Sequence, residues 1–213
     1  MTNLVVLISG RGSNMAAVTR ACRAEGWPAS IRAVVADRHE AAGIACAHEL
    51  DVPVEVVPHA EFASREAFEA VLAERIEAYA PDWLVMAGFM RVLTERFVAR
   101  FAGRMVNIHP SLLPAFAGLH THRRALAAGV CVHGATVHLV TEALDQGPIV
   151  AQAAVPVLPD DNEAQLAARV LAAEHRLYPT ALRWLVEGRA RLVGGRVALD
   201  GVPPRARLMW EAS

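Results

Sequence analysis

Apolar runs separated by stretches of helical spacing are the feature of this sequence that most constrains its fold. The first run, NLVVLI at 3–8, is apolar throughout, which is typical of a strand buried on both faces of a sheet. Four further strands are predicted, at 31–36, 53–57, 82–88 and 104–109. Helices are predicted between them, at 13–25, 40–50, 64–80 and 94–101. Strands that alternate with helices predict an α/β fold with a doubly wound, mostly parallel, Rossmann-like sheet.

The pattern changes after residue 120. A helix at 122–128 precedes two apolar segments, 132–140 and 149–157, which no long helix separates and which we expect to pair antiparallel. A long C-terminal helix at 162–187 follows, and then a hairpin at 191–199 that turns at Gly194-Gly195. The residues from Gly201 are expected to be loose. We therefore predict a single domain over 1–200 and a tail at 201–213.

Composition narrows the classes of function. The net charge of −1 creates no field that favours nucleic acid or an anionic membrane, so neither is an expected partner. No apolar run approaches the roughly 18 residues of a membrane span, and no signal peptide is evident. The three cysteines form no CxxC pair, which fits a reduced cytoplasmic location without a thiolate zinc site. All 21 basic residues are arginine, which excludes Schiff-base, pyridoxal-phosphate and P-loop lysines.

The segment SGRGSN, residues 9–14, joins the first predicted strand to the first predicted helix. Gly10 and Gly12 permit close approach of the backbone to a ligand, and free amides at a helix N-terminus suit a phosphate. A dinucleotide fingerprint is the rival interpretation, with Asp37 as the ribose-binding acid. Met15 stands where that fingerprint needs a third glycine, so a monophosphate fits better. A glycine turn that serves geometry alone also remains open.

The segment NIHPSLLP, residues 107–114, places two polar side chains at the end of a predicted strand. Side chains alternate along a strand, so Asn107 and His109 share one face before Pro110 ends the strand. An amide donor beside an imidazole is suited to binding an oxyanion, and the imidazole can also move a proton. Asp145 is the best candidate for the carboxylate that would keep His109 protonated. A core histidine bonded to backbone is the structural alternative.

Several segments together resemble the glycinamide ribonucleotide formyltransferase family, which is folate-dependent. GRGSN, AGFMRVL, NIHPSLLP, GLHTHRRAL, HGATVHLV and DQGPI occur in the family's order over residues 3–188. The resemblance implies the formyltransferase fold and transfer of a formyl group from 10-formyltetrahydrofolate to the amine of N1-(5-phospho-D-ribosyl)glycinamide, in purine biosynthesis. It implies small-molecule substrates, no metal, and a monomer or homodimer. Residues 1–104 would be the phosphate-binding half, and 105–200 the catalytic and folate-binding half.

The resemblance also implies roles for individual residues. The substrate phosphate would be held by Gly12, Ser13 and Asn14, and the ribose by Glu174. The catalytic residues would be Asn107, His109 and Asp145. Folate would be bound by Arg65, Met90, Arg91, Val92, Leu93, Asn107, Val140, Thr141, Glu142, Ala143, Leu144 and Asp145.

The implied mechanism is direct attack of the amine on the formyl carbon. Asn107 and His109 would stabilise the tetrahedral oxyanion, and His109 would then protonate the departing folate nitrogen. The sequence departs from the family at Ala115 and Ala117, where relatives often carry lysine and proline. Loss of the proline is expected to make this loop more mobile.

Other interpretations remain open. His120 and His122, with His133 and His138 further along, resemble a metal site, but no carboxylate set or cysteine completes it. Hydrolysis of formyltetrahydrofolate is a second enzymatic reading, although such deformylases carry an additional N-terminal domain. The related initiator-tRNA formyltransferases carry an extra C-terminal domain. A non-catalytic sensor of a phosphorylated ligand is the alternative outside enzymology.

Overall fold

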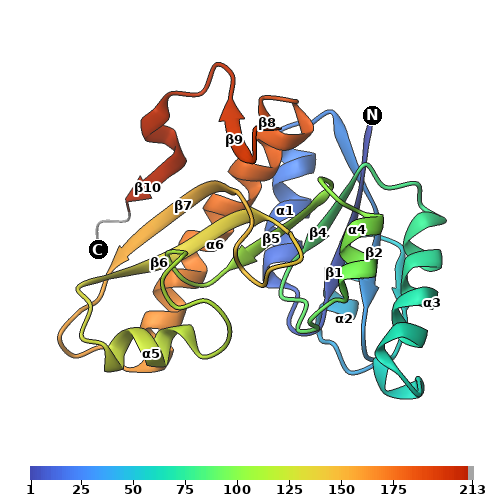
Figure 1. The fold of residues 1–213 in the computed structure, drawn as a ribbon, viewed down its shortest axis with the longest axis horizontal. Helices are drawn as coiled ribbons and strands as arrows, with labels where there is room; N and C mark the ends of the chain where they lie inside the picture. Colours follow the sequence, from blue (N-terminus) through green and yellow to red (C-terminus); the bar gives the residue numbers. More distant parts are fainter. Residues whose placement is uncertain (211–213) are drawn as a thin grey trace. The chain divides into compact units, whose positions relative to one another are not determined.

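The computed structural model describes residues 1–210 of the chain (Figure 1). These residues form two compact units, which divide after Asn107. Each unit is described by itself below. Among the described residues, no helix combines the length and the apolar character that crossing a membrane requires.

The first unit contains a parallel sheet in the strand order β5-β4-β1-β2-β3. Its strands are β1 (Thr2–Ile8), β2 (Ala29–Ala36), β3 (Val54–Val56), β4 (Trp83–Met86) and β5 (Met105–His109), the last of which runs across the division. Leu4 to Ile8 of β1 have no solvent exposure, because helices cover both faces of this central strand. The predicted buried strand and the parallel arrangement are confirmed.

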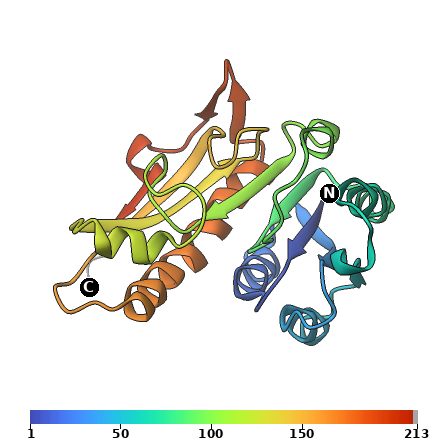
Figure 2. The same ribbon diagram turned by 60° about the horizontal axis from the view of Figure 1, so that its bottom comes forward.

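Four helices connect these strands, and they cover both faces of the sheet. They are α1 (Ser13–Ala24), α2 (Gly43–Glu49), α3 (Arg65–Glu77) and α4 (Glu95–Arg100). Figure 2 shows α1 beside α2 on one face, and α3 and α4 on the other. Because β1 leads on toward β2 while β4 leads on toward β5, the loops after β1 and β4 leave the sheet in opposite directions. Such a point is where open α/β sheets bind ligands.

The second unit combines an antiparallel pair of strands with one long helix. Its elements are α5 (Thr121–Ala127), β6 (Val132–Leu139), β7 (Ile149–Pro156), α6 (Glu163–Val186), β8 (Ala190–Val193), β9 (Arg196–Leu199) and β10 (Leu208–Trp210). Strands β6 and β7 pair antiparallel, as predicted. Strands β8 and β9 form the predicted hairpin, and Gly194 and Gly195 both adopt positive φ at its turn.

Helix α6 begins with a reciprocal cap and packs along the antiparallel pair (Figure 1). The side chain of Asn162 accepts from the Gln165 amide at 3.0 Å, and the Gln165 side chain accepts from the Asn162 amide at 2.9 Å. This capping box satisfies two amides that a helix N-terminus leaves without internal partners. The buried face repeats at three- and four-residue steps, through Leu166, Val170, Ala173, Leu177 and Ala181.

The expectation of a loose tail from Gly201 is wrong for the described residues 201–210. A short 3₁₀ helix (Pro204–Arg207) leads into β10, which pairs parallel with β7. The Arg207 guanidinium donates to the carbonyls of Ile149 at 2.6 Å and Val150 at 3.1 Å, which fastens this segment to the start of β7. The strand is three residues long and follows two prolines, so it leaves little periodicity in the sequence. Residues 211–213 of the predicted tail lie outside the described part.

Candidate active site

The loop between β1 and α1 is packed directly against the start of α2. Gly12 adopts φ of 73° at the N-cap of α1, and a Cβ atom there would lie 2.7 Å from the Cα atom of Gly43. The Gly43 amide donates to the Gly10 carbonyl at 2.9 Å. Packing alone therefore requires glycine at position 12. At Gly10 an added Cβ would meet nothing within 4 Å, so that glycine leaves open space beside the backbone.

The N-terminus of α1 is suited to an anion. The helix has 12 residues and no acidic residue in its first turn, and its N-cap residue, Gly12, has no side chain that could cap it. Ser13 and Asn14, the predicted phosphate ligands, are the first two residues of the helix. Met15, directly after them, is fully buried. Its bulk beneath the loop fits the preference for a monophosphate over a dinucleotide.

The loop after β4 is fastened to the end of β1 by Ser9. The Ser9 amide donates to the Gly88 carbonyl at 3.1 Å, and its hydroxyl accepts from the Met90 amide at 2.8 Å. These bonds place the predicted folate-binding stretch, Met90 to Leu93, at the carboxyl end of the sheet. Met90 and Val92 are more than half exposed, and exposed apolar side chains on one loop are typical of a binding surface.

A cavity of about 340 Å³ lies beside this loop within the first unit. Its apolar lining includes Phe62, Phe68 and Val92, and its cationic lining includes Arg65 and Arg91. The Arg65 guanidinium donates to the Val92 carbonyl at 3.4 Å, which brings this exposed side chain to the loop. An apolar cavity with two guanidinium groups suits a ligand that carries both a ring and a carboxylate.

Asp37 does not occupy the position of a ribose-binding acid. Its side chain is fully buried, and it forms ion pairs with Arg91 Nε at 3.0 Å and Arg38 Nε at 3.3 Å. A carboxylate that two guanidinium groups already engage is not open to a sugar hydroxyl. This pairing gives a second argument against the dinucleotide interpretation.

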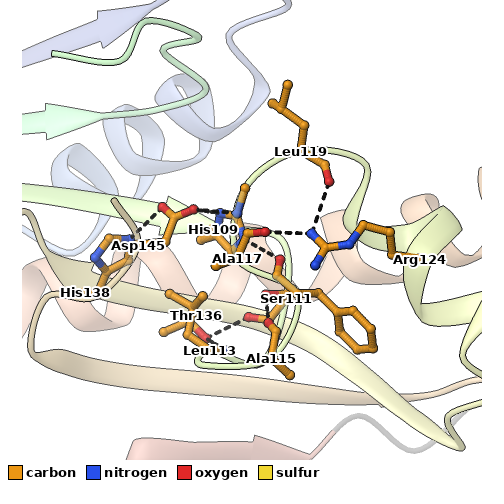
Figure 3. Close-up of polar contacts among 12 residues, drawn as sticks. His109, Ser111, Leu113, Ala115, Ala117, Leu119, Arg124, Thr136, His138 and Asp145 are labelled. Carbon is orange, nitrogen blue, oxygen red and sulfur yellow. Dashed lines mark hydrogen bonds and ion pairs between the residues drawn. The ribbon is translucent and has the colours of Figure 1, made fainter. Parts of the chain in front are cut away.

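The second unit joins His109 and Asp145, as predicted. Their Nδ1 and Oδ2 atoms lie 3.4 Å apart, and each side chain is only 8% exposed (Figure 3). Asp145 adopts φ of 55° in the loop between β6 and β7, a left-handed conformation that directs its carboxylate toward the imidazole. A pair so removed from water interacts more strongly than a surface pair.

Asp145 has two further partners that sequence reasoning missed. The Gly118 amide donates to Oδ2 at 2.8 Å, and His138 Nε2 lies 3.8 Å from Oδ1. Burial lowers the pKa of His138, against the opposing influence of the Leu139 carbonyl and Asp145, so this ring favours the neutral form. Of the two rings, His109 lies closer to the Asp145 carboxylate, at 3.4 Å against 3.8 Å. Period-two alternation along 132–140 could have indicated His138, but no sequence pattern indicated Gly118.

The loop that follows β5 folds back over His109. The His109 Nε2 atom lies 3.1 Å from the Phe116 carbonyl oxygen, so both ring nitrogens face an oxygen atom. Phe116 adopts φ of 55°, a conformation that L-residues rarely adopt. The Arg124 guanidinium donates to the Ala117 carbonyl at 2.6 Å (Figure 3). The same guanidinium lies over the Phe116 ring.

Hydrogen bonds to backbone carbonyls hold Ala115 and Ala117, the two positions at which the resemblance implied a departure from relatives. Ala115 accepts from the Ser111 hydroxyl at 2.7 Å, and Ala117 accepts from Arg124. Beneath them, the buried Thr136 hydroxyl donates to the Ser111 carbonyl at 2.7 Å and accepts from the Leu113 amide at 3.0 Å. The loop is thus fastened to β6 without the proline.

The remaining predicted residues occupy separate positions. Asn107 lies on β5, opposite Met86 of β4 and two residues before His109. Residues 141–144 form an exposed turn in which the Thr141 hydroxyl donates to the Ala143 carbonyl at 3.3 Å. Glu174 is buried on α6.

Two of the histidines weighed as a metal site, His122 and His133, form a pair. His122 Nδ1 lies 3.2 Å from His133 Nε2, with the rings nearly perpendicular. Burial, together with His122 and His109 nearby, lowers the pKa of His133 to about 4, and burial also lowers the pKa of His122. Over residues 1–210 no group of three or more His, Cys, Asp or Glu side chains is arranged to hold a metal ion.

The first unit has a doubly wound sheet, and the second has a buried imidazole–carboxylate pair, so the chain is a Rossmann-like protein with side chains suited to acid–base chemistry. The formyl transferase family model matches residues 2–182, and the chain belongs to this family. The resemblance seen in the sequence motifs is thereby confirmed.

Individual relatives agree along nearly the whole chain. Phosphoribosylglycinamide formyltransferase of Escherichia coli is 44% identical over 205 residues, which cover 95% of this chain and 97% of that protein. The crystal structure of glycinamide ribonucleotide transformylase 1 from Symbiobacterium toebii matches with a TM-score of 0.90 and 46% identity over 93% of this chain and 94% of that chain. Phosphoribosylglycinamide formyltransferase from Coxiella burnetii, in complex with CHES, matches with a TM-score of 0.90 and 45% identity over 98% of each chain.

Proposed function

We propose that this chain transfers the formyl group of 10-formyltetrahydrofolate to the amine of N1-(5-phospho-D-ribosyl)glycinamide, a step of purine biosynthesis. The observation that carries the proposal is the His109–Asp145 pair, 3.4 Å apart and nearly buried, in a chain of the formyl transferase family. The products are formylglycinamide ribonucleotide and tetrahydrofolate. Both substrates are small molecules, and the folate is a co-substrate that leaves after each turnover.

The first unit supplies the binding groups that the proposal needs for phosphate and for the tail of the folate. Gly12, Ser13 and Asn14 hold the substrate phosphate at the N-terminus of α1, whose first turn carries no acidic residue. Arg65 and Arg91 line the cavity beside the loop after β4 and pair with the glutamate carboxylates of the folate. Met90, Val92 and Leu93 contribute apolar surface for its rings.

The second unit supplies further binding groups. Glu174 accepts hydrogen bonds from the ribose hydroxyls. The folate pterin lies against the turn after β6, whose backbone groups give it donors and acceptors. The turn residues assigned to this contact are Val140, Thr141, Glu142, Ala143, Leu144 and Asp145.

The chemistry proceeds by direct attack. The amine lone pair forms a bond to the formyl carbon, and the carbonyl π electrons move to oxygen to give a tetrahedral oxyanion. Asn107 and the His109 imidazolium donate to this oxyanion, and Asp145 stabilises the charge on the ring. The amine loses a proton to Asp145 through water. His109 then protonates the folate nitrogen as the bond between that nitrogen and the formyl carbon breaks.

Transfer requires no group beyond these side chains and the two substrates. The reacting amine and formyl carbon meet as bound partners. In well-oriented systems, orientation alone lowers the barrier by roughly 7–11 kcal/mol. The oligomeric state, monomer or homodimer, stays a prediction.

Product formation with both substrates tests the proposal. Purified protein, 10-formyltetrahydrofolate and glycinamide ribonucleotide should yield tetrahydrofolate and formylated product in equal amounts. Omission of the amine substrate should stop folate release. Release at the same rate without the amine would instead identify a formyltetrahydrofolate hydrolase. Folded protein that binds both ligands and forms no product would identify a non-catalytic sensor.

A further inference from the structure

Asp37 is a buried carboxylate that the proposed mechanism does not use. It follows β2 directly, and its side chain has no solvent exposure. Its backbone carbonyl accepts from the His59 amide at 2.9 Å, and His59 Nδ1 lies 3.7 Å from Oδ2. With Arg38 and Arg91, three cationic or protonatable side chains therefore surround one carboxylate. A carboxylate is buried at high cost unless such partners offset its desolvation.

Arg91 connects this carboxylate to the cavity in the first unit. Asp37 Oδ2 lies 3.0 Å from Arg91 Nε, an ion pair without the geometry of a hydrogen bond, so the carboxylate holds this end of the guanidinium by charge. Arg91 lines the cavity of about 340 Å³ and is 31% exposed along its side chain. Among the described residues, Asp37 supplies the one carboxylate within ion-pair distance of Arg91.

We propose that Asp37 is a positioning residue for the formyl donor: its buried charge holds the Nε end of Arg91, and so keeps the guanidinium at the cavity, where it pairs with the carboxylate-bearing tail of the folate. This inference rests on the proposed function, because it takes a folate as the ligand of the cavity. Ser9 fixes the backbone of the same loop through the Met90 amide, and Asp37 fixes the adjacent side chain. Strand ends β1 and β2 thus hold one binding loop at two points.

Removal of the carboxylate should displace Arg91 even though it leaves the site more positive. Without Asp37, Arg38 and Arg91 would face each other across a site with no anion between them. Like charges repel most strongly where water is excluded. Arg91 is partly exposed and has an open route to solvent, so we expect it to swing away from the cavity. We therefore expect the affinity for the folate tail to depend on the orientation of Arg91 and not on the total charge of the site.

Equilibrium binding of two probes tests this inference without turnover. Tetrahydrofolate carries the glutamate tail and tetrahydropteroate lacks it, so the ratio of their Kd values isolates recognition of the tail. Asp37→Ala should weaken tetrahydrofolate binding by roughly 5- to 20-fold, the scale of one charge-assisted hydrogen bond, and change tetrahydropteroate binding by less than about twofold. Asp37→Asn keeps the volume and one acceptor oxygen, so it should give an intermediate loss.

The double variant distinguishes positioning from general support of the fold. If Asp37 acts through Arg91, Asp37→Ala should add almost nothing to the loss of tail recognition that Arg91→Ala causes alone. Asp161→Asn is the matched control, because it removes a buried carboxylate that pairs with Arg169 at 2.6 Å and 2.8 Å on the other unit. That variant should lower stability and leave the ratio of Kd values unchanged.

Several results would overturn the inference. These are equal weakening of both probes, additive losses in the double variant, or unchanged or tighter tetrahydrofolate binding by Asp37→Asn. If Asp37→Ala does not fold, Asp37→Asn carries the test by the same ratio. Wild-type protein that forms product but binds both probes equally would refute this inference alone. Wild-type protein that discriminates between the probes yet forms no product would refute the proposed function alone.

Discussion

The Nε2 atom of His109 lies 3.1 Å from the carbonyl oxygen of Phe116. Since Nδ1 of the same ring faces Asp145, a ring protonated on both nitrogens satisfies both neighbours. The Phe116 carbonyl thus stands where an oxygen of the reacting formyl group would accept a hydrogen bond from His109.

The first prediction concerns His109 itself. His109→Ala removes the donor to the oxyanion and the acid for the leaving nitrogen, so kcat should fall by roughly 10²- to 10⁴-fold. Binding of either substrate should change by less than about threefold, because the lost interactions form in the transition state. Steady-state kinetics and equilibrium binding check both parts. His39→Ala is the control, since that ring is 65% exposed, and unchanged turnover in His109→Ala would remove this residue from the mechanism.

Two substitutions of Asp145 separate its charge from its hold on the loop. Asp145→Asn retains an oxygen that can accept from the Gly118 amide, so the loop should resist limited proteolysis as in the wild type. It loses the charge that stabilises the imidazolium, so the rate should fall by roughly 10²-fold or more. Asp145→Ala loses both the charge and the acceptor oxygen. Its loop should therefore also be cleaved faster by the protease. Equal proteolysis of the two variants would show that the hydrogen bond from the Gly118 amide to Asp145 does not stabilise the loop.

A pair of glycine substitutions tests the loop after β1. Gly12→Ala places a Cβ atom 2.7 Å from the Gly43 Cα atom and forces an L-residue to φ of 73°, so it should cost roughly 2–4 kcal/mol of unfolding free energy. Gly10→Ala meets nothing within 4 Å and should cost less than about 1 kcal/mol. Urea unfolding measures both. Similar costs for the two variants would contradict the close approach of the loop to α2.

The elements that the sequence predicted well are those whose burial leaves a regular pattern. β1 is apolar throughout because both of its faces are covered, and β6 and β7 adjoin in sequence without a crossover helix. The polar ends of the strands were also visible, because Pro110 follows His109 and glycines follow Ile8. These features are local, and local spacing determines them.

Contacts between distant residues left no comparable pattern. Asp37 and Arg91 belong to different loops, and only the strand order places them together. The sequence indicates only that Asp37 follows a strand, and this position alone favours a ribose-binding acid, not a partner for Arg91. The Phe116 carbonyl is backbone, so no residue type reports its contact with His109. β10 was missed because three residues cannot display a period.

The last prediction concerns the His122–His133 pair and acid. One ring must donate to the other across 3.2 Å, and a proton on both facing nitrogens removes the acceptor. The pKa of His133 is about 4 in the folded protein, chiefly because of burial, against roughly 6.5 in the unfolded chain. The unfolded chain therefore binds more protons between these values, so stability should fall as pH drops from about 6.5 to about 4, by at most about 2 kcal/mol at pH 5.

Urea unfolding at pH 7.5 and pH 5 measures this effect. Between these two pH values, His133→Gln should lose less unfolding free energy than the wild type. The exposed control His39→Gln should retain the wild-type loss, and parallel behaviour of both variants would exclude His133 as its source.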